Sequence, residues 1–326
     1  MVSGQTIAVV GAGMAGLTAA QLLQARGASV CVFEKSRGPG GRMSTRRRDL
    51  SQFDHGAQYF TAHSGLFAAV VREWETAGVV APWSGQFCRW ADGELEAESG
   101  SAPRWVGTPR MSALTRHLSA GCSVISGCRV VNAQRAEDGW WLSAEDGAHH
   151  GPFDALVLTC PGPQAALLAP AQGTVYERAM SLTYSPCWAA MISVKSQARP
   201  PFSGCRCEHP VVAWIAHDSS KPGRPAGGHW VLHAQASWSA ENQEAPADVV
   251  ASTLRAAFEE MVGIEVESVQ VHRWLYALSD GVPGSTMVYD PDCALGLCGD
   301  GLAGTGVEDA WQSAFDLVRV MDGRGD

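Results

Sequence analysis

The stretch TIAVVGAGMAG, residues 6–16, decides the fold of this chain. Its first five residues are mostly apolar and β-branched, which predicts a buried parallel strand. Apolar residues at helical spacing follow up to Gly27, and a second apolar run, SVCVF (residues 29–33), ends at Glu34. The sequence therefore predicts a strand, a glycine turn, a helix and a second strand. This order is typical of a Rossmann-like dinucleotide-binding domain.

Each glycine of the turn has a physical reason. Gly11 permits the tight turn, Gly13 lets the backbone approach a pyrophosphate, and Gly16 lets the helix pack closely on the strand. The helix that begins near Met14 offers N–H groups and the positive end of its dipole to phosphates. Glu34 lies 18 residues after Gly16, where a carboxylate accepts hydrogen bonds from ribose hydroxyls.

A second glycine loop, KSRGPGGRM (residues 35–43), follows Glu34 directly. With Arg42, such a loop approaches the phosphates and a flavin from the other side, and simple nicotinamide dehydrogenases do not need it. The extended motif resembles the Glu-x-x-x-x-x-Gly-Gly-Arg pattern of the FAD-binding amine-oxidase-like superfamily. We therefore expect FAD as cofactor. Because Cys298 lies within a predicted strand, we expect the FAD to be bound non-covalently.

Further segments narrow the resemblance to the renalase family, especially its bacterial members. FDHGAQYFTA (residues 53–62) looks like the segment beside the flavin in that family, and HRWLY (residues 272–276) is also family-specific. The other similar segments are RWVG (104–107), MSAL (111–114), Trp214, SKPGR (220–224), CGD (298–300) and GVEDAW (306–311). The chain departs from the pattern at Gly306, where an arginine is expected, and this alters the expected shape of the ring pocket.

The resemblance implies a flavoenzyme that oxidises the 1,2- or 1,6-dihydro isomers of NAD(P)H. Hydride passes to flavin N5, and the electrons pass to O2, giving hydrogen peroxide and NAD(P)+. We expect no catalytic side chain and no metal, because the flavin performs the hydride transfer. The expected cofactor-binding residues are Gly11, Gly13, Met14, Gly16, Phe33, Glu34, Lys35, Gly41, Arg42, Ala57, Gln58, Val130, Gly299, Asp300 and Val307. The expected substrate-binding residues are Tyr59, Phe60, Thr61, Ala62, His63, Trp105, Trp188, Arg273, Tyr276 and Ala303.

The expected fold class is α/β, with a discontinuous Rossmann-like FAD-binding domain and a second, mixed α+β substrate domain. The expected limits are 1–80, 104–162 and 286–326 for the FAD-binding domain, and 81–103 and 163–285 for the substrate domain. Within the first domain, residues 123–132 are predicted to form one strand. Asp300 is predicted to precede the last helix and to bond the ribityl chain of the flavin.

The composition of the chain limits the classes of molecule that we expect the protein to bind. The formal charge is −9, so nucleic acid is not an expected partner. Prolines and glycines interrupt the longest uncharged stretch, and we expect no membrane segment. The ten cysteines form no Cys-x-x-Cys pair, which favours reduced thiols in a cytoplasm. We expect the protein to be a monomer or a homodimer. Two alternatives stay open: a flavin amine oxidase or desaturase with the same Gly-Gly-Arg loop, and a non-catalytic nucleotide-binding protein on the same fold.

Overall fold

The computed structural model describes residues 2–48, 51–98, 102–195, 202–281 and 284–323. Both expected domains include some residues outside these ranges. The chain divides into two compact units. Unit 1 comprises Met1–Gly41, Thr115–Tyr184 and Ser279–Asp326, and unit 2 comprises Arg42–Leu114 and Ser185–Leu278. The division differs from the domain limits expected from sequence at residues 42–80, 104–114, 163–184 and 279–285.

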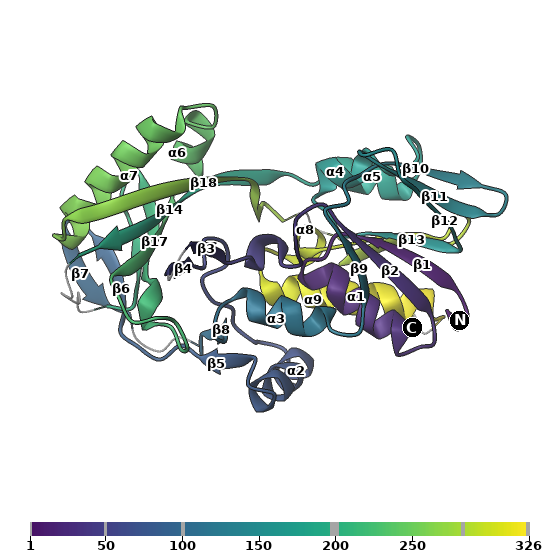
Figure 1. Ribbon diagram of the computed structural model, residues 1–326, viewed down its shortest axis with the longest axis horizontal. Helices are drawn as coiled ribbons and strands as arrows, with labels where there is room; N and C mark the ends of the chain where they lie inside the picture. Colours follow the sequence, from purple (N-terminus) through teal and green to yellow (C-terminus); the bar gives the residue numbers. More distant parts are fainter. Residues whose placement is uncertain (1, 49–50, 99–101, 196–201, 282–283, 324–326) are drawn as a thin grey trace. The chain divides into compact units, whose positions relative to one another are not determined.

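A six-stranded sheet forms the centre of unit 1 (Figure 1). Its strands are β1 (Thr6–Val10), β2 (Ser29–Glu34), β9 (Ser123–Ser126), β13 (Ala155–Leu158), β19 (Met287–Asp290) and β20 (Leu295–Cys298). Their order is β19-β20-β13-β1-β2-β9. The strands from β20 to β9 are parallel, and β19 is antiparallel to β20. All residues of β13 and β20 are buried, because a parallel sheet is covered on both faces.

Several helices belong to unit 1: α1 (Met14–Gln24), α4 (Gly162–Ala166), α5 (Thr174–Met180), α8 (Asp300–Ala303) and α9 (Val307–Met321). Helices α1 and α9 pack side by side (Figure 1). Helix α9 buries Ala310, Ala314, Leu317 and Val318, the spacing of a single apolar helix face. This packing holds α1, and with it the glycine turn, against the sheet.

A small antiparallel sheet completes unit 1. Its strands are β10 (Val130–Ala136), β11 (Gly139–Ala144) and β12 (His149–Phe153). The prediction of one strand over residues 123–132 is therefore wrong. Gly127 interrupts the run with a φ of +73°, a conformation that glycine adopts without strain, and Val130 then pairs with Ala144 in the small sheet.

A seven-stranded sheet forms the centre of unit 2. Its strands are β6 (Phe87–Ala91), β7 (Glu94–Ala97), β14 (Tyr184–Val194), β15 (Gly204–Cys207), β16 (Val212–His217), β17 (His229–Ala234) and β18 (Val266–Ser279), in the order β18-β14-β17-β16-β15-β6-β7. Helix α7 (Ala247–Val262) buries Leu254 and Phe258 against it. The rings of Phe258 and Trp230 pack 5.6 Å apart.

Shorter elements complete unit 2, and residues 59–63, which were expected to bind substrate, lie in a connection between two of them. The shorter elements are η1 (Gly41–Met43), which spans the unit boundary, β3 (Arg46–Arg48), β4 (Ser51–Phe53), α2 (Gly65–Thr76), β5 (Val80–Pro82), β8 (Trp105–Gly107), η2 (Asp218–Ser220) and α6 (Ala236–Glu241). Helix α3 (Ser112–Ser119) also spans the boundary. None of the helices in the described residues is long and apolar enough to cross a membrane.

Candidate cofactor and substrate sites

The glycine turn of unit 1 leaves open space at the N-terminus of α1. A Cβ atom at Gly13 would meet none of the described atoms within 4 Å, whereas one at Gly16 would lie 1.9 Å from the carbonyl oxygen of Gly11. Gly13 is also the N-cap residue of α1, so it has no side chain to bond the N–H groups of the first turn. These groups and the space before them fit the pyrophosphate of a dinucleotide such as FAD.

Glu34 fastens the two glycine loops together. Its Oε2 accepts a hydrogen bond of 2.9 Å from the N–H of Ala12, and its Oε1 accepts one of 2.7 Å from the N–H of Ser36. The N–H of Gly40 donates to the carbonyl of Ala12 at 2.9 Å, and this bond folds the second loop back onto the first. A carboxylate has about four acceptor positions, so Glu34 retains positions for a ribose hydroxyl.

The other expected cofactor residues of unit 1 lie in more ordinary surroundings. Phe33 is buried in the core, with its ring 4.9 Å from that of His150, and its carbonyl accepts the N–H of Gly11 at 2.8 Å. Lys35 donates from Nζ to the side chain of Gln164 at 3.2 Å. Val130 is half-buried in β10. Their side chains thus contribute chiefly to the packing and surface of the turn.

The segment from Gly299 to Val307 joins strand β20 to the last helix. Asp300 begins the four-residue helix α8, which ends at Ala303, and the last helix, α9, starts only at Val307. Asp300 thus precedes the last helix, as predicted, with the short helix α8 between them, and its bond to the ribityl chain stays a prediction. The carboxylate of Asp309 accepts the N–H groups of Thr305 and Gly306 at 2.9 and 2.8 Å, so α9 caps its own N-terminus.

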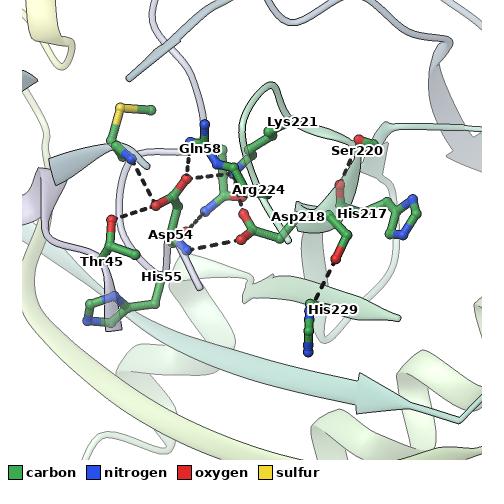
Figure 2. Close-up of polar contacts among 12 residues, drawn as sticks. Thr45, Asp54, His55, Gln58, His217, Asp218, Ser220, Lys221, Arg224 and His229 are labelled. Atoms are coloured by element: carbon green, nitrogen blue, oxygen red, sulfur yellow. Dashed lines mark hydrogen bonds and ion pairs between the residues drawn. The ribbon is translucent and has the colours of Figure 1, made fainter. Parts of the chain in front are cut away.

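Four buried charged side chains of unit 2 lie together, and we call them the ionic quartet: Asp54, Asp218, Lys221 and Arg224 (Figure 2). Arg224 donates from Nη2 to Oδ2 of Asp54, and the ammonium of Lys221 lies 2.6 Å from Oδ1 of Asp218 and 3.6 Å from Oδ2 of Asp54. Two positive and two negative side chains balance in formal charge, and burial raises the pKa of Asp218 above its ordinary value. Pairing of this kind is what allows charges to be buried at all.

Asp54 is the most heavily bonded member of the quartet. Its Oδ1 accepts the hydroxyl of Thr45 at 2.6 Å and the N–H of Met111 at 3.0 Å. Burial alone raises the pKa of Asp54, but the charges of Lys221 and Arg224 and the bonds from Thr45 and Arg224 outweigh it and hold that pKa below its ordinary value. Asp54 is therefore ionised at neutral pH.

Gln58 connects the quartet to the segment that was expected to lie beside the flavin. Its Oε1 accepts Nζ of Lys221 at 3.1 Å, and its Nε2 donates to the carbonyls of Asp54 and of Gly56, the latter at 2.9 Å. The amide of Gln58 is thus occupied within unit 2. This amide supports the backbone of its own segment, and Gln58 is only 6% exposed to solvent.

The Gly-Gly-Arg motif contacts this segment through its backbone. The N–H of Ala57 donates to the carbonyl of Arg42 at 2.9 Å, and a Cβ at Gly56 would lie 1.9 Å from that carbonyl oxygen. Gly56 is thus required by close approach of two chain segments. The guanidinium of Arg42 donates to the carbonyl of Ala277 at 3.2 Å.

Tyr59 lies in an aromatic cluster of unit 2. Its ring centroid is 5.6 Å from that of Trp214 and 6.3 Å from that of Trp83. The guanidinium of Arg104 lies 5.0 Å from the ring centroid of Tyr59 and 3.8 Å from that of Phe87, and it is paired with Glu98 at 2.8 Å. Trp83 and Trp214 are buried, whereas Tyr59 is half-buried, so its ring keeps some surface on which another ring can stack.

Two of the residues expected beside Tyr59 have structural roles. The backbones of Phe60 and Trp105 exchange two hydrogen bonds, of 2.9 and 2.7 Å, and the buried ring of Phe60 packs 6.1 Å from that of Phe67. Thr61 and His63 bond each other at 2.8 Å between Oγ1 and Nε2. Phe60 and Trp105 therefore fix the backbone on which Tyr59 is held, and Ala62 lies between Thr61 and His63 on the same segment.

The remaining expected substrate residues of unit 2 do not join the aromatic cluster. Trp188 is in the core, where its Nε1 donates to the carbonyl of Asn242 at 3.0 Å. Arg273 donates to the carboxylate of Glu244 at 2.9 Å and to the carbonyl of Gln243, which gives it a structural acid as partner. Tyr276 is half-buried in β18.

No role of the ionic quartet was predicted from the sequence, although Asp54, Lys221 and Arg224 lie in segments that resemble the renalase family. The sequence feature that could have indicated these residues is their charge, because they interrupt stretches with few other charged residues. They lie, however, in quoted segments that are far apart in the chain. Asp54 and Arg224 are separated by 170 residues. Only the fold shows that they meet.

Two family descriptions match this chain. Residues 9–74 match the NAD(P)-binding Rossmann-like domain, and residues 90–320 match the flavin containing amine oxidoreductases. The second match spans most of the chain, so the protein belongs to the flavin-containing amine oxidoreductase family. The predicted fold class is confirmed, and membership of this family implies a flavin-dependent oxidoreductase with FAD as cofactor.

Individual proteins resemble this chain either in a short stretch of sequence or in the overall fold. A 4,4'-diapophytoene desaturase of Staphylococcus haemolyticus is 54% identical over 50 residues, which are 15% of this chain and 10% of the desaturase. The chain therefore aligns with only a tenth of the length of this curated relative. An oxidoreductase from Methanosarcina mazei superimposes with a TM-score of 0.73 at 14% identity, covering 97% of this chain and all of the other. A triple mutant of putrescine oxidase gives 0.75 at 12% identity, covering 98% and 99%. Identities this low show the fold alone.

Proposed function

We propose that this flavin-dependent oxidoreductase oxidises a small substrate at a carbon next to a nitrogen atom. The observation that carries the proposal is the cradle of unit 1, in which Glu34 fastens two glycine loops and Gly13 leaves space for phosphates. FAD, when bound, supplies a hydride acceptor and a route for the electrons to O2. A carbon beside nitrogen is a good hydride donor because the nitrogen lone pair stabilises the cation that remains.

The chain's own residues bind and orient in this proposal. Half-buried Tyr59 offers aromatic surface to a flat or apolar substrate, and the buried rings of Trp83 and Trp214 pack beside it. Phe60 and Trp105 hold the backbone beside Tyr59 in place. If the product is an aromatic cation, no proton has to leave the reacting carbon, so a catalytic base is not required.

The first candidate substrate is an amine. The family description names amine oxidoreductases, and the similar putrescine oxidase has the same fold. Family membership supports this class, and the short match to a desaturase supports a related removal of hydrogen from carbon. An amine would have to react as the neutral base, because its lone pair is needed to stabilise the product.

The second candidate is an isomeric dihydronicotinamide, as the resemblance to renalases implies. A specific observation favours it: the guanidinium of Arg104 lies over the ring of Tyr59. An ammonium group would find that face already covered by a cation, and like charges repel. A neutral dihydropyridine ring with phosphates elsewhere on the molecule has no such conflict. Its oxidation at carbon 2 or 6 also takes hydride from a carbon next to nitrogen.

The two candidates are separated by anaerobic reduction of the purified holoprotein. The bleaching of the flavin absorbance would be followed after mixing with putrescine and other primary amines, and separately with 1,2- and 1,6-dihydro-NAD and dihydro-NADP. Arg104 predicts that the dihydronicotinamides bleach the flavin faster. Faster bleaching by the amines would assign the protein to the first class, and bleaching by neither would contradict the proposal as a whole. Reoxidation in air with formation of hydrogen peroxide would identify O2 as the electron acceptor.

A further inference from the structure

We propose that Lys221 is a positioning residue for the reaction: it fixes the amide of Gln58 and, through that amide, the backbone from Asp54 to Tyr59. The inference rests on the proposed function, in which Tyr59 offers aromatic surface to the substrate. It concerns a residue that neither the family match nor the sequence analysis assigned to a site.

The ammonium of Lys221 determines which way the amide of Gln58 points. Lys221 has three N–H donors and no acceptor, and its Nζ is directed at oxygens of Asp218 at 2.6 Å, Gln58 at 3.1 Å and Asp54 at 3.6 Å (Figure 2). Its side chain is fully buried, so no water can replace these partners. The oxygen of the Gln58 amide must therefore face Lys221.

The nitrogen of the same amide must then face the backbone. Nε2 of Gln58 donates to the carbonyls of Asp54 and Gly56. A flipped amide would place its NH2 group against the ammonium of Lys221 and its oxygen against two carbonyls, which is unfavourable at both ends. The lysine thus selects one amide orientation, and that orientation holds two carbonyls of the segment.

The rest of the segment is held by fixed bonds on its other side. The carbonyl of His55 accepts Nε1 of Trp274 at 3.0 Å and Nε2 of His233 at 3.1 Å. The N–H of Ala57 donates to the carbonyl of Arg42 at 2.9 Å. Gln58 closes the remaining side, and Tyr59 follows it directly. A loosened amide would therefore leave Tyr59 attached to a backbone held from one side.

Stability alone does not explain a buried lysine at this place. Replacing buried ion pairs by apolar side chains of similar volume is often neutral or stabilising. The quartet nevertheless contains two acids and two bases, with no net formal charge. One of the bases, Lys221, also donates a hydrogen bond to the neutral amide of Gln58. Determination of a single backbone conformation is the role that fits this arrangement.

The test is a double-mutant cycle in the holoprotein. The variant Lys221→Met with Asp218→Asn removes one charge of each sign and keeps the quartet neutral, and Gln58→Met removes the amide. We expect each to lower the limiting rate of anaerobic flavin reduction by about 10- to 100-fold, as small misplacements do. The three changes together should be no worse than either alone, because Lys221 acts through Gln58. Additive losses, or an unchanged rate in Lys221→Met/Asp218→Asn, would overturn the inference.

Two further variants keep the test decisive. Gln58→Glu retains an oxygen for Lys221 but cannot donate to the two carbonyls, so we expect a loss of similar size even if the lysine variant fails to fold. A normal rate in Gln58→Glu would count against the inference. Arg89→Met, in an exposed ion pair with Glu208 at 2.5 Å in the same unit, is the control and should change nothing.

Failure of the proposed function can be recognised separately. If no tested substrate reduces the wild-type protein, the same cycle is read from the dissociation constant of FAD and the visible circular dichroism of the bound flavin. We expect weaker binding and altered dichroism in the Lys221 and Gln58 variants, again without additivity. If both quantities equal those of the wild type, Lys221 is not a positioning residue.

Discussion

The carboxylate of Glu34 accepts a hydrogen bond of 2.9 Å from the backbone N–H of Ala12, which lies 22 residues earlier in the chain. A second bond, of 2.7 Å, comes from the N–H of Ser36. Glu34 is only 5% exposed, so both bonds are shielded from water. The acid that the sequence predicts as a ribose ligand thus also determines the shape of the phosphate cradle.

Replacement of Glu34 by alanine should weaken FAD binding. Two buried N–H groups lose their acceptor, and an unsatisfied buried group costs about 1–3 kcal/mol. We expect the dissociation constant of FAD to rise by about 10- to 100-fold, measured by titrating the apoprotein and following flavin fluorescence. An unchanged dissociation constant would show that the cradle does not depend on Glu34.

Gly13→Ala should separate FAD binding from stability. The backbone of Gly13 is extended and a Cβ would meet open space, so the apoprotein should unfold at the same temperature as wild type. The added methyl group would occupy the space that fits the pyrophosphate, and FAD affinity should fall by about 100-fold or more. Gly65→Ala, where a Cβ also meets open space and which lies outside both glycine loops, is the matched control and should bind FAD normally. Normal affinity in Gly13→Ala would place the phosphates elsewhere.

The ionic quartet should contribute strongly to stability. Asp54→Asn leaves Lys221 and Arg224 without one of their two acids, and breaking a buried pair costs about 3–5 kcal/mol. The lowered pKa of Asp54 adds a pH effect. The stability that its charge contributes is fully present above the ordinary pKa of 3.8 and is lost as the pH falls through the lower pKa of the folded state. Urea unfolding between pH 4 and pH 2 should show this loss in the wild type and not in Asp54→Asn.

Two buried histidines should destabilise the protein in mild acid. Burial lowers the pKa of His55 to about 3 and that of His233 to about 4, from 6.5. Below pH 6.5 the unfolded chain binds protons that the folded chain does not, so stability falls by about 1.4 kcal/mol per pH unit for each histidine. His233→Gln should reduce this slope between pH 6.5 and pH 5, whereas the exposed control His117→Gln should not. Equal slopes in His233→Gln and wild type would contradict these pKa values.

The N-terminal half of the cradle could be predicted because its signals are local. The strand at Thr6–Val10 was predicted with the bounds that the structure has, since a short buried run that ends at a glycine leaves little choice of limits. The strand over residues 123–132 failed because Gly127 redirects the chain between two sheets. A single glycine in such a run does not reveal which sheet the next residues will join.

The ionic quartet could not be predicted for a different reason. Asp54 and Arg224 meet across 170 residues of sequence, and a buried charge leaves no periodic pattern that would reveal its partner. Likewise, the sequence predicted Gln58 as a residue near the flavin, which stays a prediction, but it did not predict the bonds of Gln58 to Lys221 and to its own backbone. Local signals predict the elements, and only the fold pairs the charges.

The central claim, that this chain binds FAD in the Glu34 cradle and reduces it with a substrate oxidised beside nitrogen, is tested most directly by the visible spectrum of the purified protein. We predict flavin bands that disappear under nitrogen on addition of an isomeric dihydronicotinamide or a neutral amine and return in air. A colourless protein that takes up no added FAD would contradict the account.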